Sequence, residues 1–465
     1  MIAAAFPPTG GPGVQRSAKF AKYLPGFGWQ PIVWALDHIE GMPRDPSLLE
    51  DLPTQVISYA PHLQGRSYST LTRAARQCAG RGSLASRFIS ALNWRFVTDA
   101  HFGQLLDDFS AWASASLAPL SRLVVSHRID VLYSTFSPAS NHWLGLMLKE
   151  RTGLPWVADF RDLWIDDCRY AESSGARRRA HREFQQLVLE NADIVVGVTP
   201  SQTRILAQHV PHMRSKFVTI TNGFDPADFE SVPKERASDR PVFVLAHVGR
   251  LDKWRATEAL FDGLRSFAAR LGSARTDFEF RIVGHAAADT LARVGQTGVP
   301  FTFVPYVSHR EAVLEMTQAN ALLLPLPVGP RGESIIAAKL FEYLAAGKPI
   351  LIIGPTDGEC ENIVQGLEAG LAVRPEAGAI ADSLWHLFSA WSAGTPLPGC
   401  RNPAVSRYSR ISLTSQLADC FQRLAVAGGS MFSPGRPSVR GRTPGAGRQV
   451  RTGVNRPEPA RQLTD

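Results

Sequence analysis

Long apolar runs are missing from this chain of 465 residues. A membrane-spanning helix needs about 18 or more consecutive apolar residues, whereas the richest stretches, 321–326 and 350–353, are only as long as a strand. Residues 1–6 carry no basic segment and run into Pro7-Pro8, so they do not resemble a secretory signal. These absences favour a cytoplasmic protein that does not span a membrane.

Cysteine and clustered positive charge are also scarce. The five cysteines are scattered and form no Cys-x-x-Cys pair, which argues against a disulfide framework and against a zinc site. The net charge is +8, but residues 428–465 supply much of it through seven Arg against Glu458 and Asp465. Because the rest of the chain carries little net charge for its length, we expect no nucleic-acid partner.

Two segments stand out by composition. Residues 428–465 contain seven Gly and five Pro and few large apolar residues, so we expect a disordered basic tail. Segment 62–98 holds six Arg and no acidic residue, interleaved with aromatic residues such as Trp94 and Phe96. It suits contact with an anionic membrane surface at the inner face of the cell membrane, and the alternative is a solvated basic face.

Short apolar runs alternate with stretches of helical period through the rest of the sequence. An irregular, charged stretch at 225–240 divides this pattern into two halves. Strand–helix–strand repetition predicts parallel sheets with helices on both faces, and ligands bind such sheets at the carboxyl ends of the strands. We therefore expect an α/β chain of two Rossmann-like domains that face each other across a cleft. Strands are expected at 2–6, 31–36, 131–134, 156–159, 194–198, 217–220, 242–248, 278–283, 301–305, 321–326 and 349–353.

Seven motifs follow one another in an order that is far more specific than any one of them. The series resembles, from about residue 5 to about residue 425, the family-4-type retaining glycosyltransferases of the GT-B fold, and above all the subset that works on bacterial surface polysaccharides. The motifs are Phe6-Pro-Pro-Thr-Gly-Gly-Pro-Gly-Val-Gln-Arg16, Val157-Ala-Asp-Phe-Arg-Asp-Leu-Trp164, Val198-Thr-Pro-Ser201, Thr221-Asn-Gly-Phe-Asp225, His247-Val-Gly-Arg250, Ile282-Val-Gly284 and Lys339-Leu-Phe-Glu-Tyr-Leu-Ala-Ala-Gly-Lys-Pro349.

The resemblance implies an acceptor-side domain at 1–222 and a donor domain at 223–427, whose last helix, at about 405–425, packs back on the first domain; the tail 428–465 follows. It implies a hexosyltransferase-type enzyme that moves a sugar from a nucleotide-sugar donor to a saccharide or lipid-linked acceptor with retained anomeric configuration. No Asp-x-Asp pair is present, so we expect no metal ion and no other cofactor. The strand at 2–6 is short for this fold, which favours a start codon upstream of Met1.

The second half offers the groups that a nucleotide sugar requires, namely positive charge, backbone N–H donors and a carboxylate. Arg250 can bind two phosphate oxygens, with Lys253 or Arg255 as its basic partner, and by resemblance this pair neutralises the leaving diphosphate. The alternative is a solvated loop with ordinary surface charges. The donor-side residues expected from the resemblance are Gly249, Arg250, Lys253, Arg255, Gly284, Tyr306, Val307, Ser334, Lys339 and Glu342, with Tyr306 and Val307 reading the base and Arg250 and Glu342 also catalytic.

A helix beginning at Ile335 and capped by Ser334 is expected to present its N-terminus to the diphosphate. By resemblance, Glu342 on this helix accepts hydrogen bonds from the ribose hydroxyls. The family has glutamates at both positions, whereas this chain has Ser334 at the first, with Glu333 one place away. The alternative for Glu342 is an exposed helix charge that pairs with Lys339.

The first half supplies the acceptor side. Gly11 and Gly13 permit a tight turn after the first strand, and the polar residues from Asp159 to Asp162 end another strand. Many family members have an active-site His at about the position of Arg161, and Arg161, Asp162 or His142 is left to replace it. The alternatives are a plain turn and a structural histidine. The expected acceptor-side residues are Gly11, Gly13, Arg16, Asp159 and His142, with Arg161 and Asp162 catalytic.

Two other functions compete. Gly11-Pro-Gly13 followed by Asp37 partly imitates the fingerprint of an NAD(P)-dependent oxidoreductase, although Arg16 replaces the third glycine. A non-catalytic nucleotide-sugar-binding protein is the second alternative, because of Ser334 and the missing histidine.

Overall fold

The N-terminal residues lie in the middle of the parallel sheet that the first half of the chain forms. The N–H of Ile2 donates to Tyr133 O at 2.7 Å, and the N–H of Ala3 donates to Trp34 O at 3.0 Å. The strand expected at 2–6 is therefore shorter than expected: its bridges are at Ile2, and its backbone pairing ends at Ala4, whose carbonyl accepts from the N–H of Leu36 at 3.0 Å, because the chain bends at residues 4 and 5. The strands are β1 (Ile32–Trp34), paired with β2 (Ile57–Tyr59), and β3 (Leu132–Phe136), β4 (Trp156–Phe160), β5 (Ile194–Gly197) and β6 (Phe217–Thr219), paired in that order.

The second half forms a six-stranded parallel sheet in the order β12-β11-β10-β7-β8-β9. Successive residues of β10 enter different cores, because Leu323 points to one face of the sheet and Leu322 and Leu324 to the other. Both faces are thus covered, as expected for a parallel sheet. The strands are β7 (Phe243–Leu251), β8 (Phe278–Ala286), β9 (Phe301–Val304), β10 (Ala321–Pro325), β11 (Ile350–Ile353) and β12 (Gly370–Val373).

Helices cover both faces of each sheet. In the second half, α10 (Glu258–Leu271) and α15 (Ala377–Ser392) share the core of one face, and α12 (His309–Gln318), α13 (Ala338–Ala346) and α14 (Glu359–Gly366) share that of the other. In the first half, one core contains α6 (Ser110–Ser126), α7 (Ala139–Thr152), α8 (Gly175–Asn191) and α9 (Pro200–Gln208). The remaining helices are α2 (Ser47–Glu50), α11 (Ala288–Gly295) and the 3₁₀ helices η4 (Pro211–Lys216), η5 (Pro226–Asp228), η6 (Gly272–Asp277) and η8 (Pro403–Tyr408).

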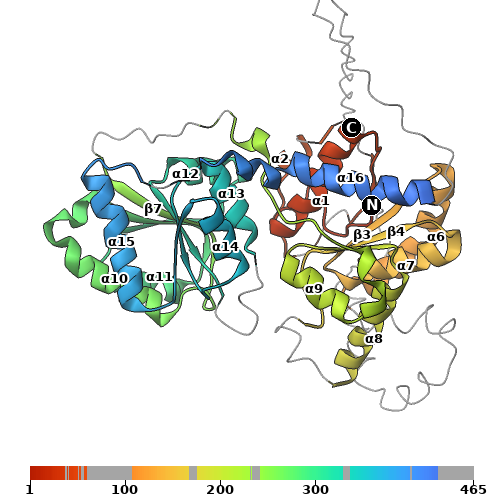
Figure 1. Cartoon of the computed structure of the whole chain (residues 1–465), viewed down its shortest axis with the longest axis horizontal. Helices are drawn as coiled ribbons and strands as arrows, with labels where there is room; N and C mark the ends of the chain where they lie inside the picture. The colour runs from red at the N-terminus through yellow and green to blue at the C-terminus, as the bar shows by residue number, and fades with distance from the viewer. Residues whose placement is uncertain are drawn as a thin grey trace, which may run out of the picture. The chain divides into compact units, whose positions relative to one another are not determined.

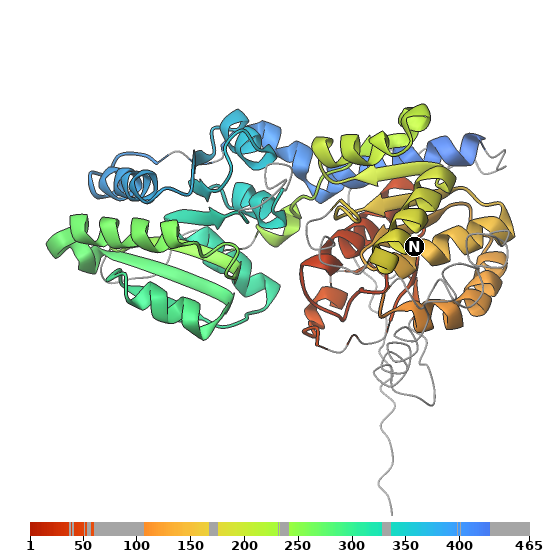
Figure 2. The same cartoon turned by 90° about the horizontal axis from the view of Figure 1, so that it is seen from below.

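The last helix, α16 (Arg410–Ala427), lies against α1 (Pro12–Tyr23) and η1 (Leu24–Phe27) of the first half (Figures 1 and 2). Its residues Leu417 and Phe421 are buried in the same cluster as Phe20 and Leu24. The chain therefore returns to the first sheet after it has completed the second.

The computed structural model describes residues 1–36, 39, 41–50, 52–53, 57–59, 107–166, 175–230, 232, 241–327, 336–397, 399 and 401–427, all within one compact unit, Met1–Met431. The tail 428–465, the basic segment 62–98, Asp37 and Ser334 lie outside the described residues. Among the described helices, none is both long enough and apolar enough to span a membrane.

The strand expectations from 31–36 onward are confirmed, since each of those ten runs overlaps an observed strand. Two strands were not expected, β2 and β12. Both lie at the end of their strand order; β12 is only half-buried, and the three residues of β2 are interrupted by Ser58. The boundary at 222/223 lies between the end of β6 and the start of β7 and stays a prediction.

Candidate functional site

Two glycines bring the carboxyl ends of β7 and β8 close together. Gly249 has a φ of 144° and Gly284 a φ of 118°, conformations that favour glycine. A Cβ atom on Gly284 would lie 2.5 Å from Gly249 O, so a larger residue would push the two strands apart. The close approach fixes the backbone next to Arg250.

Arg250 is still part of β7, which continues to Leu251, three residues beyond the expected end. It lies opposite His285 of β8. The Arg250 side chain is exposed, and it makes no hydrogen bond or ion pair with any residue that the structure describes. Its guanidinium donors are therefore available to an anion.

The loop after β7 contains Lys253 and Arg255, the two residues expected to act with Arg250, and they differ in their contacts. Arg255 donates from Nη1 to Asp252 Oδ2 at 2.6 Å, so its charge is already paired. The Lys253 ammonium lies 5.1 Å from the ring centroid of Trp254, and the indole itself is 60% exposed. Within the described part of the chain Lys253 has no carboxylate partner, which makes it the better candidate.

Helix α13 does not begin where the sequence predicted. Its first residue is Ala338 and its N-cap is Ala337, which provides no side-chain cap. The expectation of a helix that begins at Ile335 is wrong, because the ψ of 127° at Ala337 is extended and breaks the helical hydrogen bonding there. A Cβ atom on Gly249 would lie 4.0 Å from Lys339 Cγ, so the first turn of α13 lies beside the end of β7.

Glu342 is a partly buried carboxylate, 15% exposed, with cationic neighbours. Lys339 Nζ donates to Glu342 Oε2 at 2.8 Å, and His309 Nδ1 lies 3.8 Å from Glu342 Oε1. Burial raises the pKa of this carboxyl, but Lys339, His309 and Arg410 outweigh burial, so the pKa lies below its usual value. Glu342 is therefore ionised at neutral pH and can accept hydrogen bonds. The i, i+3 pair with Lys339 is present, but Glu342 is not an exposed helix charge.

His309, which the sequence reasoning missed, is the first residue of α12. Ser308 caps this helix and forms a capping box with Glu311. The ring of His309 is also bound on its other side, where Nε2 lies 2.9 Å from Asp228 Oδ2 of η5. The Ser-x-x-Glu pattern could have located the start of α12, but no sequence signal connects His309 with Asp228.

His247 is a second missed residue, buried beneath the end of β7. Its Nδ1 lies 3.1 Å from Leu323 O, and its Nε2 is buried without a direct hydrogen bond. Burial lowers the pKa of the ring to about 4, although the backbone of Leu323 and of Arg250 opposes this change. The ring is therefore neutral, and it packs under Gly249.

On the acceptor side, Arg16 and Asp159 bind each other rather than face solvent. Arg16 Nε donates to Asp159 Oδ2 at 2.9 Å and Nη2 to Oδ1 at 2.8 Å, while Tyr133 and Thr135 donate to Oδ2 at 2.7 and 3.0 Å. The side chains are 2% and 0% exposed. Arg16 also donates to the carbonyls of Ile220 and Thr221. We therefore assign this pair to holding α1, β4 and the segment after β6 together.

Asp225, in the segment after β6, is bound by the same helix. It pairs with Lys19 at 2.7 Å and with Lys22 at 2.8 Å, and it accepts a hydrogen bond from Tyr23. Lys19 also pairs with Asp228 at 2.9 Å. Basic residues three apart, from Arg16 through Lys19 to Lys22, form one face of a helix, and that spacing could have revealed this contact in the sequence.

The side chain of Arg161, which follows β4, contacts the N-terminus of α1. Its Nη1 donates to Gly13 O and its Nη2 to Ser137 O at 2.7 Å. A Cβ atom on Gly13 would lie 2.6 Å from this guanidinium, so Gly13 provides space for it. Gly11 is the N-cap, with a φ of 102°. The structure thus brings Gly11, Gly13 and Arg161 together, with Asp162 next in sequence.

His142 lies elsewhere, within the first-half core. Its Nδ1 lies 2.7 Å from Ser134 Oγ, which also accepts a hydrogen bond from Trp156 Nε1. Burial lowers the pKa of the ring to about 3, and the ring packs against Phe160. Because the side chain is fully buried, it cannot reach an acceptor in this structure.

Tyr306 and Val307 follow β9. Tyr306 is 57% exposed, and its hydroxyl lies 3.4 Å from the position that a Cβ on Gly10 would occupy. Burial and the nearby Asp45 raise the pKa of this hydroxyl. The residue therefore lies near the glycine-rich turn, and contact with a base stays a prediction.

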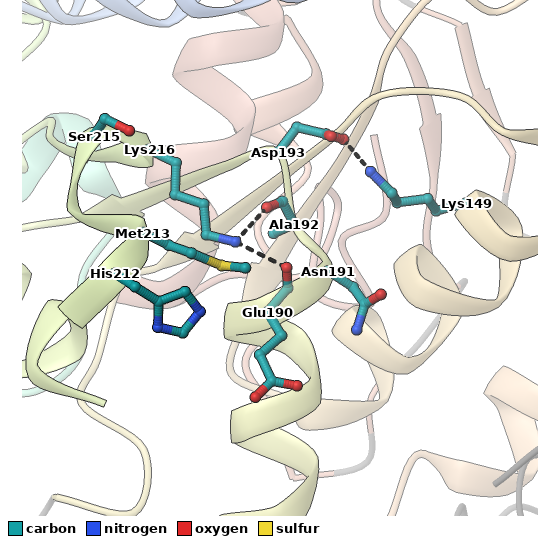
Figure 3. A pocket seen from close by; sticks show the side chains of 9 residues that line it. All are labelled: Lys149, Glu190, Asn191, Ala192, Asp193, His212, Met213, Ser215 and Lys216. Atoms are coloured by element: carbon teal, nitrogen blue, oxygen red, sulfur yellow. Dashed lines mark hydrogen bonds and ion pairs between the residues drawn. The ribbon is translucent and has the colours of Figure 1, made fainter. Parts of the chain in front are cut away.

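A pocket of about 470 Å³ lies away from these residues (Figure 3). It is lined by residues before β5 and β6, and so lies at the amino ends of the strands, opposite to the edge where α/β sheets bind ligands. Its cations are already engaged, since Lys149 pairs with Asp193, and Lys216 donates to the carbonyls of Glu190 and Ala192, as Figure 3 shows. We do not assign the site to it. Among the described residues, no three His, Cys, Asp or Glu side chains gather as a metal site would require.

Comparison with known proteins supports the resemblance. Residues 15–223 match the family model of the glycosyl transferase 4-like domain. No curated protein matches this chain in sequence. Solved structures do match, among them a glycosyltransferase from Rickettsia africae, with a TM-score of 0.59, 13% identity and coverage of 88% of this chain and 94% of that one.

Two further structures are similar. HepE of Anabaena, in complex with UDP and glucose, has a TM-score of 0.56 and 15% identity, and covers 90% of this chain and 98% of its own. WaaG, a glycosyltransferase involved in lipopolysaccharide biosynthesis, has a TM-score of 0.54 and 14% identity, with coverage of 90% and 98%. The expected fold class is confirmed: this chain has the GT-B fold.

Proposed function

We propose that this chain is a retaining glycosyltransferase that moves a hexose from a nucleotide sugar to a saccharide or lipid-linked precursor of a surface polysaccharide. The observation that carries the proposal is that cations without carboxylate partners and an ionised carboxylate occur together near the end of β7. Arg250 and Lys253 have no carboxylate partner within the described residues, while Glu342, on the helix whose first turn lies beside the end of β7, is ionised and only partly buried. A diphosphate and a ribose need such groups.

The donor diphosphate would bind between Arg250, Lys253 and the free N–H groups at the start of α13. When the bond between the sugar C1 and the diphosphate oxygen breaks, negative charge grows on that oxygen. Fixed cations and N–H groups stabilise this charge without reorganisation, so they lower the barrier more than they strengthen substrate binding. An acceptor hydroxyl then forms the new bond to C1 on the same face, and its proton leaves with the diphosphate.

Glu342 would accept hydrogen bonds from the ribose hydroxyls, which anchors the nucleotide while the sugar reacts. The sequence offers no metal-binding motif, and we propose that the cations of the chain take the role that a metal ion has in other transferases. Arg161 and Asp162, at the α1 turn, are the proposed groups on the acceptor side. HepE was solved with UDP and glucose, and WaaG acts in lipopolysaccharide biosynthesis, which supports a UDP-hexose and an envelope acceptor here.

The test is a donor panel followed by a transfer assay. Thermal shift with UDP-, GDP- and dTDP-sugars should identify one nucleotide that stabilises the protein, and radiolabelled sugar from that donor should then enter membrane lipid extracts. Arg265→Ala, at an exposed residue of α10, should behave as wild type. NMR of the product should show that the new glycosidic bond has the same anomeric configuration as the sugar in the donor.

Two outcomes would support the alternatives. Binding of a nucleotide sugar without transfer to any acceptor would indicate a non-catalytic binding protein. Enhanced NADH fluorescence without binding of any nucleoside diphosphate would favour the oxidoreductase. The structure weakens that alternative, because Arg16 fills the place where the dinucleotide fingerprint needs its third glycine.

A further inference from the structure

Three elements far apart in sequence meet at the ring of His309. Asp228 belongs to η5, His309 begins α12, and Glu342 lies on α13. The ring is bound on one side at 2.9 Å by Asp228 and approaches Glu342 on the other at 3.8 Å. A histidine held between two carboxylates has a fixed orientation, and its protonation changes its interaction with both.

The two oxygens of Glu342 have different neighbours. Lys339 Nζ lies 2.8 Å from Oε2, whereas the contact with the His309 ring is made by Oε1, which lies 3.8 Å from Nδ1. Arg410, at the start of α16, adds positive potential from a third direction. The direction of Oε1 therefore depends on the ring, because Lys339 already occupies the other oxygen.

The groups around the ring favour its charged form. A cation at the first position of a helix is disfavoured by the helix dipole, and burial and Lys339 also oppose it. Asp228 and Glu342 outweigh these effects, so the pKa of His309 lies above its usual value. Lys19 pairs with the other oxygen of Asp228 at 2.9 Å and fixes that carboxylate in turn.

We propose that His309 is a positioning residue that orients Glu342 toward the ribose of the donor, so that ribose recognition weakens when the ring loses its proton. The proposal rests on the proposed function, because it assigns Glu342 to the ribose. The ring does not touch the nucleotide; Asp228 holds it in place, and it acts only through Glu342.

The experiment measures the preference for ribose over deoxyribose. Dissociation constants of UDP and dUDP, and of GDP and dGDP, are measured by calorimetry on the full chain between pH 5.5 and 9. The ratio of the deoxy to the ribo value isolates the contact with the 2′-hydroxyl, since both members of a pair carry the same phosphates and their titration cancels. In the wild type this ratio should fall about threefold to fivefold as the pH rises, with a midpoint above pH 6.5, as expected when one charged contact is lost.

His309→Gln should give a low ratio that does not change with pH, because glutamine can hydrogen-bond to Asp228 but cannot carry charge. The matched control is His386→Gln, at an exposed histidine of α15, which should keep the wild-type profile. Asp228→Asn supplies a second variant if His309→Gln does not fold, and it should move the midpoint to lower pH.

Each contrary result has a distinct meaning. A normal ribose preference with the same pH profile in wild type and His309→Gln would overturn the role of His309 and leave the proposed function intact. Absence of binding by any nucleoside diphosphate, or equal binding of the ribo and deoxy forms at every pH, would overturn the assignment of Glu342 and the inference with it. A merely structural role of His309 would lower thermal stability without changing the ratio.

Discussion

The basic residues of α1 and those at the end of β7 carry the same charge, but they differ in burial and in ion pairing. Arg16 and Lys19 of α1 are buried, and each is bound to a carboxylate. Arg250 and Lys253 are exposed and have no such partner among the described residues. A buried charge requires a partner for the chain to fold, whereas an exposed cation without one can bind an anionic ligand. The first pair therefore stabilises the structure, and the second is suited to a diphosphate.

The sharpest way to test the comparison is Asp159→Ala, which leaves the Arg16 guanidinium buried without its carboxylate. We expect a loss of about 3 to 5 kcal/mol in the free energy of unfolding, measured by urea denaturation. The control is Asp382→Ala, which breaks an exposed pair with Arg270 and should cost about 1 kcal/mol or less. Equal, small losses in both variants would mean that the buried pair is not structurally important.

The second-largest effect is expected from acid, which should weaken the ion pairs between Asp225 and α1. Burial raises the pKa of Asp225, but Lys19, Lys22 and Tyr23 outweigh burial and lower it to about 2. Because the folded-state pKa is depressed, the stabilisation is complete above the usual value of 3.8 and is lost as the pH falls toward 2. We expect the wild type to lose about 2 kcal/mol more than Asp225→Asn between pH 5 and pH 2.5. The same acid loss in both proteins would assign acid sensitivity to other groups.

Arg250→Ala tests the other side of the comparison. We expect turnover to fall by a factor corresponding to at least ~1.5 kcal/mol, because the charged contact to the departing diphosphate is lost. The melting temperature should stay within error of the wild type, since the side chain is exposed and unpaired in the described structure. A large drop in stability with normal turnover of the remaining protein would reverse the assignment of the two regions.

The smallest effect is expected for Glu342→Ala. Loss of the ribose contact should raise the donor KM by a factor corresponding to about 1 kcal/mol and leave kcat nearly unchanged. The donor concentration series is run in parallel with Glu311→Ala, which removes a carboxylate from the nearby α12 cap but not from the site. A fall in kcat without a change in KM would place Glu342 at the reacting sugar instead.

Strands were easier to predict than the ends of helices. The central strands are continuous apolar runs because both faces of a parallel sheet are covered, and that signal is local in the sequence. The start of α13 could not be predicted, since Ser334 and Ala337 both precede an apolar helical pattern and only the observed ψ of Ala337 decides between them. Residues 2–6 looked like a strand, but their backbone pairing ends at Ala4, where the chain bends.

Part of the candidate site was also predictable. Gly249, Arg250 and Glu342 were found because they fall at strand ends or on a helix within motifs of a known family. Asp159 was placed correctly at a strand end, but the sequence could not indicate that Arg16 occupies its oxygens. In the sequence, His142 and His309 are both isolated histidines that no local pattern distinguishes. Only the packed structure shows that His142 is a buried core residue and that His309 contacts Glu342.

The sequence by itself determined the alternation of strands and helices, the division into two halves and the residue types available for a diphosphate, because these depend on local pattern and composition. Only the tertiary structure decided which charges are paired. Arg16, Lys19, Arg250 and Lys253 are indistinguishable as isolated cations. The partners of Arg16 and Lys19 come from segments up to about two hundred residues away, and burial and distance are properties of the packed chain, so no local pattern in the sequence records them.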